Sequence, residues 1–145
     1  ASLRRFAHYD CWDDKVRASI LVDSGADLLL YGMGEKSIVQ MADALDGGLH
    51  IKEVTYINGS AYLTETPEQI YNGLEIESFE EVKRNKQSYC RAFMTQMQNQ
   101  NHLSGKTLLQ KHGKSYVAVN PPAADAAGAG CCVCFAVYPS AASNV

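Results

Sequence analysis

The residues best suited to chemistry lie in a short turn between an apolar run and an amphipathic segment. The run Leu28–Tyr31 leads into G-M-G-E at positions 32–35, after which apolar residues recur at helical spacing from Ile38 to Leu45. This pattern predicts a strand, a tight turn and a helix. Glycines let a ligand approach the backbone, and the first N–H groups of a helix attract anions. The ligand-binding candidates are therefore Gly32, Gly34, Glu35 and Ser37.

The turn also has a purely structural interpretation. Two glycines that only close a short connection between strand and helix would leave the same pattern, and the third glycine of the dinucleotide fingerprint is missing. Glu35 in the first helical turn suits the helix dipole, which argues against a general base.

A second candidate lies in the first fourteen residues, where charged and aromatic side chains are dense. Arg4 and Arg5 are candidates for binding an anionic or carboxylate ligand, because a guanidinium group matches such groups bidentately. An ion-paired surface turn explains the same residues equally well. Asp13 or Asp14 is expected to cap a helix that holds Val16, Ile20 and Leu21.

The five cysteines predict neither a disulfide framework nor a metal site. Cys11 and Cys90 are isolated, whereas Cys131, Cys132 and Cys134 are crowded together without a distant partner. Iron–sulfur motifs use wider spacing. A reducing cytoplasm is the expected location.

The apolar elements predict an α/β fold. A strand that is apolar at every position is buried on both faces, which is typical of a parallel sheet covered by helices, as in Rossmann-like domains. The 145 residues suffice for one domain, and the net charge of −3 argues against a nucleic-acid partner. No apolar run reaches the roughly 18 residues that would predict a membrane span.

Further elements are expected after this α/β unit. Asn58-Gly59 between Ile51–Ile57 and Ala61–Leu63 predicts a hairpin. A second hairpin is expected around His112-Gly113. Between the two hairpins, Ser78 and Glu81 form a capping box at the start of a long helix from Phe79 to about Gln98.

The segment from residue 124 to 145 lacks such patterning. With a suitable choice of synonymous codons, removal of one base turns Ala124–Asn144 into LTQQELDAVFALPYTRLPHP, a patterned peptide. We therefore divide the chain into an α/β domain at 1–123 and an unstructured, frameshifted tail at 124–145. The chain also starts inside a patterned segment, so we interpret it as an internal fragment.

Several stretches together resemble the YgiQ-type radical SAM proteins. They are ASLRRFAHYDCWDDKVRASILVDSGADLLLYGMGEKSIVQMA, SFEEVKRNKQSYCRAF, GKTLLQKHGKSYVAVNPPA and the frame-restored LPYTRLPHP. The resemblance covers about residues 1 to 123 and places the chain immediately before the radical SAM barrel. The G-M-G-E turn is similar to the G-E-G-E turn of cobalamin-binding-type domains, although the cobalt-ligating histidine motif is absent.

The resemblance implies cofactors that this chain does not hold. The intact protein is expected to carry a [4Fe-4S] cluster on a C-x-x-x-C-x-x-C motif and to bind S-adenosylmethionine. This chain lacks that motif, so it has no predicted cofactor, catalytic residue or metal ligand, and its expected partner is the missing barrel of the same polypeptide. The first hypothesis is therefore an accessory fragment of a radical SAM enzyme, inactive alone. The alternative is a stand-alone α/β module that binds a phosphate-bearing ligand at Gly32–Ser37.

Overall fold

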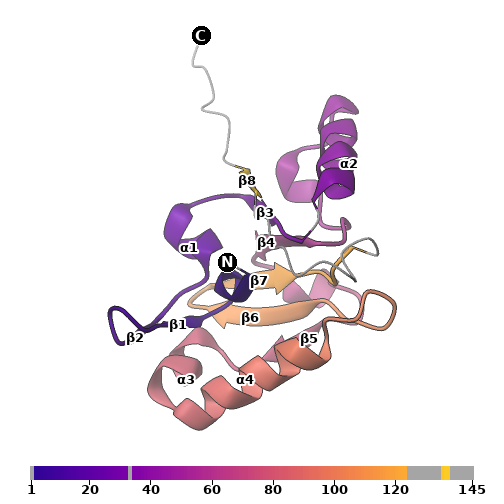
Figure 1. Cartoon of the computed structure of the whole chain (residues 1–145). Helices are drawn as coiled ribbons and strands as arrows, with labels where there is room; N and C mark the ends of the chain where they lie inside the picture. The colour runs from indigo at the N-terminus through magenta and orange to yellow at the C-terminus, as the bar shows by residue number, and fades with distance from the viewer. Residues whose placement is uncertain (1, 33, 124–134, 138–145) are drawn as a thin grey trace.

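Short apolar strands from distant parts of the chain assemble into one six-stranded sheet. The computed structural model describes residues 2–32, 34–123 and 135–137. The sheet has the order β5-β6-β7-β4-β3-β8 (Figure 1). Its strands are β3 (Leu28–Leu30), β4 (Ser60–Thr64), β5 (Leu74–Ile76), β6 (Leu108–His112), β7 (Ser115–Val119) and β8 (Phe135–Val137).

The two faces of this sheet bury alternate residues of the same strands. Leu29 of β3 packs in one cluster with Leu21, Val82 and Ala92, which come from three helices on that face. Leu28 and Leu30 pack on the opposite face in a second cluster that contains Met41 and Ala44 of one further helix and Tyr62 of β4. All three β3 residues are therefore buried, as a strand between two helical layers requires.

The helices begin and end at recognisable capping residues. α1 (Ile20–Ser24) begins after Ser19, whose hydroxyl accepts from the Leu21 N–H, and ends at Gly25 with φ +68°. α2 (Glu35–Asp46) follows Gly34, which caps the helix without a side chain. α3 (Phe79–Arg84) starts with the predicted capping box of Ser78 and Glu81.

The predicted long helix is wrong at one residue. Asn85 has extended backbone angles, φ −134° and ψ 117°, and separates α3 from α4 (Lys86–Gln98). Its side-chain oxygen accepts from the Gln87 N–H at 2.9 Å, so it caps the second helix. The apolar spacing continues through this break, which is why periodicity alone predicted a single helix.

The remaining elements are short. A 3-10 turn η1 (Ser2–Arg5) precedes a two-stranded antiparallel ribbon of β1 (His8–Asp10) and β2 (Lys15–Arg17). η2 (Ile51–Glu53) and η3 (Pro67–Gln69) lie on either side of β4. Val16 is therefore in a strand, and the predicted helix cap at Asp13 or Asp14 is wrong.

The predicted parallel arrangement around β3 is also wrong. β3 runs antiparallel to both β4 and β8, and β5–β6 is the parallel pair in the described sheet. The class is α/β with a mixed sheet. An apolar run reports that both faces of a strand are buried, but it carries no information about the direction of the neighbouring strands.

The two predicted hairpins have different outcomes. β6 and β7 pair antiparallel around Gly113, which has φ +63°, so the second hairpin is confirmed. The first is wrong, because the segment before Asn58-Gly59 contains η2 instead of a strand. β8 comes from the predicted tail and pairs with β3. Cys131, Cys132, Cys134 and the rest of 124–134 and 138–145 lie outside the described residues, so the boundary at residue 123 stays a prediction.

Candidate functional site

The structure places Arg5, from one predicted site segment, against Tyr31, the residue that precedes the other segment. The Arg5 guanidinium carbon lies 3.9 Å from the centre of the Tyr31 ring, and Tyr31 immediately precedes Gly32. A cation at this distance over an aromatic face is electrostatically attracted to it. Arg5 therefore lies beside the strand end from which the candidate turn departs.

Tyr31 is a fixed platform for this arginine. The ring is buried, and its hydroxyl donates to the backbone carbonyl of Asn120. Burial raises the pKa of Tyr31 to about 12, although Arg5 acts in the opposite direction. The phenol consequently stays protonated at neutral pH and acts as a hydrogen-bond donor.

The turn itself joins β3 to α2 with glycine where the backbone requires it. Gly32 has φ +82°, a conformation that residues with a side chain rarely adopt. Gly34 is buried at the start of α2, and Glu35 is exposed in the first turn of that helix. Arg4 is exposed on η1, and Met33 lies outside the described residues.

Ser37 has a structural contact at this turn. Its side chain is buried, and its hydroxyl donates to the carbonyl of Asn58 at 2.9 Å. The adjacent Gly59 bonds to two further segments, because its carbonyl accepts from the Tyr31 N–H at 2.8 Å and its N–H donates to the Pro121 carbonyl at 2.7 Å. These contacts fix the start of α2 relative to β3 and β4.

Removal of the Arg5 side chain tests the contact with Tyr31. Arg5→Ala is expected to lower the free energy of unfolding by about 1 kcal/mol, because a half-buried cation–π contact is lost. Urea unfolding of the full chain measures the change. Arg4→Ala on the same short turn is the matched control and should stay within about 0.5 kcal/mol of the parent. Equal losses in both variants would contradict the assignment.

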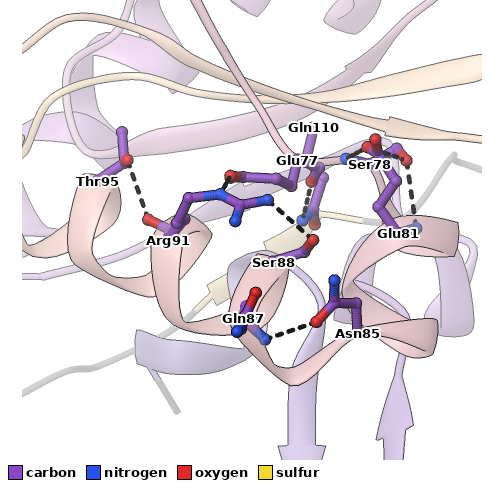
Figure 2. A network of polar contacts seen from close by, with 9 residues as sticks. All are labelled: Glu77, Ser78, Glu81, Asn85, Gln87, Ser88, Arg91, Thr95 and Gln110. Carbon is purple, nitrogen blue, oxygen red and sulfur yellow. Dashed lines mark hydrogen bonds and ion pairs between the residues drawn. The ribbon is translucent and has the colours of Figure 1, made fainter.

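A polar network centred on the buried Gln110 lies on the other half of the sheet (Figure 2). Gln110 is fully buried on β6, where its side-chain oxygen accepts from the Ala7 N–H at 2.7 Å and its side-chain N–H donates to the Glu77 carbonyl at 2.9 Å. The Glu77 carboxylate in turn accepts from Arg91 at 2.7 Å. This network connects the N-terminal segment, β6 and α4.

His112 completes the network and is neutral. Its Nε2 lies 3.0 Å from the Gln110 oxygen, which requires Nε2 to be the protonated nitrogen. Nδ1 is buried without a partner in the described structure, and the ring stacks on Phe79 at 5.2 Å. Burial lowers the pKa of His112 to about 4, because the imidazolium would hold an unpaired N–H away from water.

This depressed pKa predicts a loss of stability in acid. The unfolded chain protonates His112 near its ordinary pKa of 6.5 and the folded chain only near 4. The neutral ring's contribution is therefore fully present above pH 6.5 and is lost as the pH falls toward 4. We expect a loss of roughly 3 kcal/mol across this window, measured by urea unfolding. His112→Phe keeps a stacked ring and should remove this dependence of unfolding free energy on pH. His102→Gln is the control and should keep it. An unchanged pH dependence in His112→Phe would contradict the assignment.

A broad groove of about 850 Å³ runs along β5 between the start of α3 and the end of α4. Glu75, Glu77 and Glu81 line it together with Lys111. Glu81 is already bound by Ser78, whose hydroxyl and N–H lower the pKa of that carboxyl. Two of the three carboxylates thus have local partners, Glu77 with Arg91 and Glu81 with the capping Ser78.

The described residues do not fit an iron–sulfur cluster or another metal ion. No group of three or more histidine, cysteine, aspartate or glutamate side chains converges anywhere in residues 2–32, 34–123 and 135–137. Cys11 and Cys90 are exposed and separate. No helix in the same part of the chain combines the length and the apolar composition that crossing a membrane requires.

Sequence reasoning missed the polar residues that organise this region. Gln110, His112 and Asn120 were all absent from the predicted site. A glutamine inside an apolar strand is itself a signal, since residue 110 points to the same face as the buried Leu108. The partners of that glutamine were not visible, because Ala7 lies 103 positions away in the chain.

Comparisons with known proteins identify the family. The family model described as Radical SAM N-terminal matches residues 1–131. A UPF0313 protein of Clostridium botulinum (strain ATCC 19397 / Type A) is 52% identical over 122 residues, which are 84% of this chain and 19% of the relative. A UPF0313 protein of Clostridium perfringens (strain ATCC 13124) is 50% identical over 123 residues, with the same coverage. No solved structure matches.

These relatives are much longer than the chain described here. The chain spans about a fifth of the length of the curated relatives it matches. The family match covers most of the chain and includes the turn at Gly32 and the segment with Arg4 and Arg5. The chain therefore belongs to the radical SAM N-terminal family, together with the YgiQ-type UPF0313 proteins.

Proposed function

We propose that this chain is the accessory N-terminal part of a radical SAM enzyme that holds its [4Fe-4S] cluster and S-adenosylmethionine in other polypeptide. The match to the radical SAM N-terminal family over residues 1–131 carries this proposal. The lack of converging metal ligands in the described residues supports it, because those residues offer no place for a cluster. The chain alone is then inactive, and its role is to support the catalytic part.

Within such an enzyme, the end of β3 is the surface that faces a substrate or the catalytic part. Arg5 supplies a positive charge there, and the half-buried Gly32 carries no side chain that would cover its backbone. The buried contacts of Tyr31 and Ser37 hold this surface in one geometry. A preformed cationic surface suits an anionic group better than a flexible one would, because little ordering is needed on binding.

Iron binding tests whether the cluster lies outside this chain. After anaerobic reconstitution with iron and sulfide, the full-length Clostridium botulinum relative is expected to hold about four iron atoms per chain and to cleave S-adenosylmethionine reductively. The 145-residue chain is expected to hold no stoichiometric iron and to show no cleavage. A variant with Cys131, Cys132 and Cys134 all changed to serine is the matched control.

Each result has a distinct meaning. Stoichiometric iron on the chain that disappears in the triple variant would place the cluster here and overturn the proposal. A relative that binds no cluster would overturn the assignment to radical SAM chemistry.

A second candidate function is binding of a phosphate-bearing small molecule by the chain itself. The contact of Arg5 with Tyr31 favours it, since it places a guanidinium beside the glycine turn before α2. Titration of the 145-residue chain with inorganic phosphate, followed by amide NMR, tests it. Saturable shifts at Gly34 and Glu35 that vanish in Arg5→Ala but persist in Arg84→Ala would favour this candidate. Unsaturable or absent shifts would exclude it for inorganic phosphate.

A further inference from the structure

The loop between β1 and β2 exposes the single tryptophan of the chain. Trp12 is 93% exposed, whereas a tryptophan with a structural role is largely buried. The loop projects from the body of the molecule beyond the six-stranded sheet (Figure 1). Trp12 therefore contributes little to the packing of the described residues.

The loop that carries Trp12 is nevertheless held in one conformation. Arg17 donates to Asp10 at 2.6 Å and also pairs with Asp13, while Lys15 lies 3.1 Å from Asp13. The backbone N–H of Trp12 donates to the Asp10 carboxylate at 3.0 Å. Four residues on either side of the loop tip are thus connected through side-chain ion pairs, and the Trp12 backbone is bonded to one of them.

The last residue of the loop and the base of the ribbon are fixed as well. Asp14 has φ +48°, which a residue with a side chain adopts only when its surroundings impose it, and it accepts from the Tyr9 hydroxyl at 2.5 Å. At the base, His8 is buried and the Tyr9 N–H donates to the Tyr89 hydroxyl of α4 at 3.3 Å. The backbone that carries the exposed indole is therefore held in place on both sides.

This combination is typical of a binding anchor. An aromatic side chain on a fixed backbone has only two side-chain torsions left to order when it enters a pocket, so it contributes strongly to association. The ribbon around this loop carries three carboxylates, Asp10, Asp13 and Asp14, against two cations, Lys15 and Arg17. That balance disfavours nucleic acid and anionic lipid, and it favours a protein with an apolar pocket and a basic rim.

We propose that Trp12 docks the N-terminal domain onto the rest of the same full-length polypeptide. This inference rests on the proposed function, since it assigns a contact surface to the accessory domain. The occupant is argued from the relatives, of which about four fifths lie outside the region matched by this chain. A domain of a longer chain has neighbours that are present at high effective concentration, so a single exposed aromatic side chain on a fixed loop suffices for contact.

Fluorine NMR of 5-fluorotryptophan tests the docking. The protein is the full-length Clostridium botulinum relative in which residues 1–123 of this chain replace the matched segment, and Trp12→Phe assigns the resonance. We expect the Trp12 resonance to shift between H2O and D2O in the isolated 145-residue chain and to lose most of this solvent shift in the full-length protein. Trp12→Ala should also raise the rate of proteolysis between the two parts at least tenfold, whereas Tyr71→Ala, a change at an aromatic side chain that is 96% exposed, should not.

The outcomes separate this inference from the proposed function. A full-length protein with its cluster and S-adenosylmethionine cleavage in which Trp12 keeps the whole solvent shift would overturn the docking and leave the function intact. If the unmodified relative bound no cluster, the proposed function would be overturned. If the hybrid fails to fold, labelled 145-residue chain is titrated with the relative lacking its matched segment; a saturable Trp12 shift supports docking, and none overturns it.

Discussion

Gln110→Leu is expected to lower the free energy of unfolding by about 3 kcal/mol and the melting temperature by about 10 °C. Leucine matches the volume of glutamine but cannot hydrogen-bond. The buried Ala7 N–H and His112 Nε2–H, now 2.7 and 3.0 Å from the Gln110 oxygen, would lose their acceptor, and the Glu77 carbonyl would lose its donor at 2.9 Å. Urea and thermal unfolding of the full chain measure the effect.

A second glutamine near the network, Gln87, provides the control for Gln110→Leu. Gln87→Leu changes an exposed glutamine in the first turn of α4 (Figure 2) and should shift stability by less than about 0.5 kcal/mol. Gln110→Glu keeps the acceptor for Ala7 but places a second oxygen against the Glu77 carbonyl, so it should destabilise at neutral pH as well. A tolerated leucine at position 110 would show that the network contributes little.

Gly59→Ala is expected to destabilise the chain by about 3 kcal/mol. The backbone at Gly59 has φ +74°, which costs a residue with a side chain about 1–2 kcal/mol. An added methyl carbon would also lie 3.1 Å from the Tyr31 carbonyl oxygen and 3.5 Å from the Ser37 hydroxyl. Only the approach to the Tyr31 oxygen is closer than an ordinary contact, and this oxygen lies at the end of β3, where it cannot move without disturbing the candidate site.

Gly113→Ala separates the two contributions. Gly113 has a similar φ of +63°, but nothing lies within 4 Å of the added carbon. This control should lose only about 1 kcal/mol, which is the conformational cost alone. Chemical unfolding of both variants measures the difference, and equal losses would mean that the close approach at Gly59 is relieved by small movements.

The sequence determined the elements whose signals are local. The helix Glu35–Asp46 follows from apolar spacing, the capping box at Ser78 from two residues three positions apart, and the hairpin at Gly113 from the turn between two apolar strands. Each signal lies within a few residues, so backbone sterics and nearby hydrogen bonds suffice to read it. The specific string of the first forty residues likewise identified the family.

Tertiary structure decided which elements meet. The apolar run at β3 predicted burial on both faces correctly, but its antiparallel neighbours β4 and β8 are set by chain connections that no local pattern records. Asn58-Gly59 was recognised as a turn, yet the segment before it does not pair with β4. Distant segments compete to pair with a given strand, and the packing of the complete core determines which of them pairs.

The candidate site shows the same division. The residue types of Arg5 and of the turn at Gly32 marked both segments as candidates, because a guanidinium and a glycine turn before a helix have local chemical meaning. Only the fold placed Arg5 over Tyr31, 26 positions away, and only the fold joined Gln110 to Ala7. Local sequence specifies which interactions a side chain can make, whereas long-range packing determines which other residue it contacts.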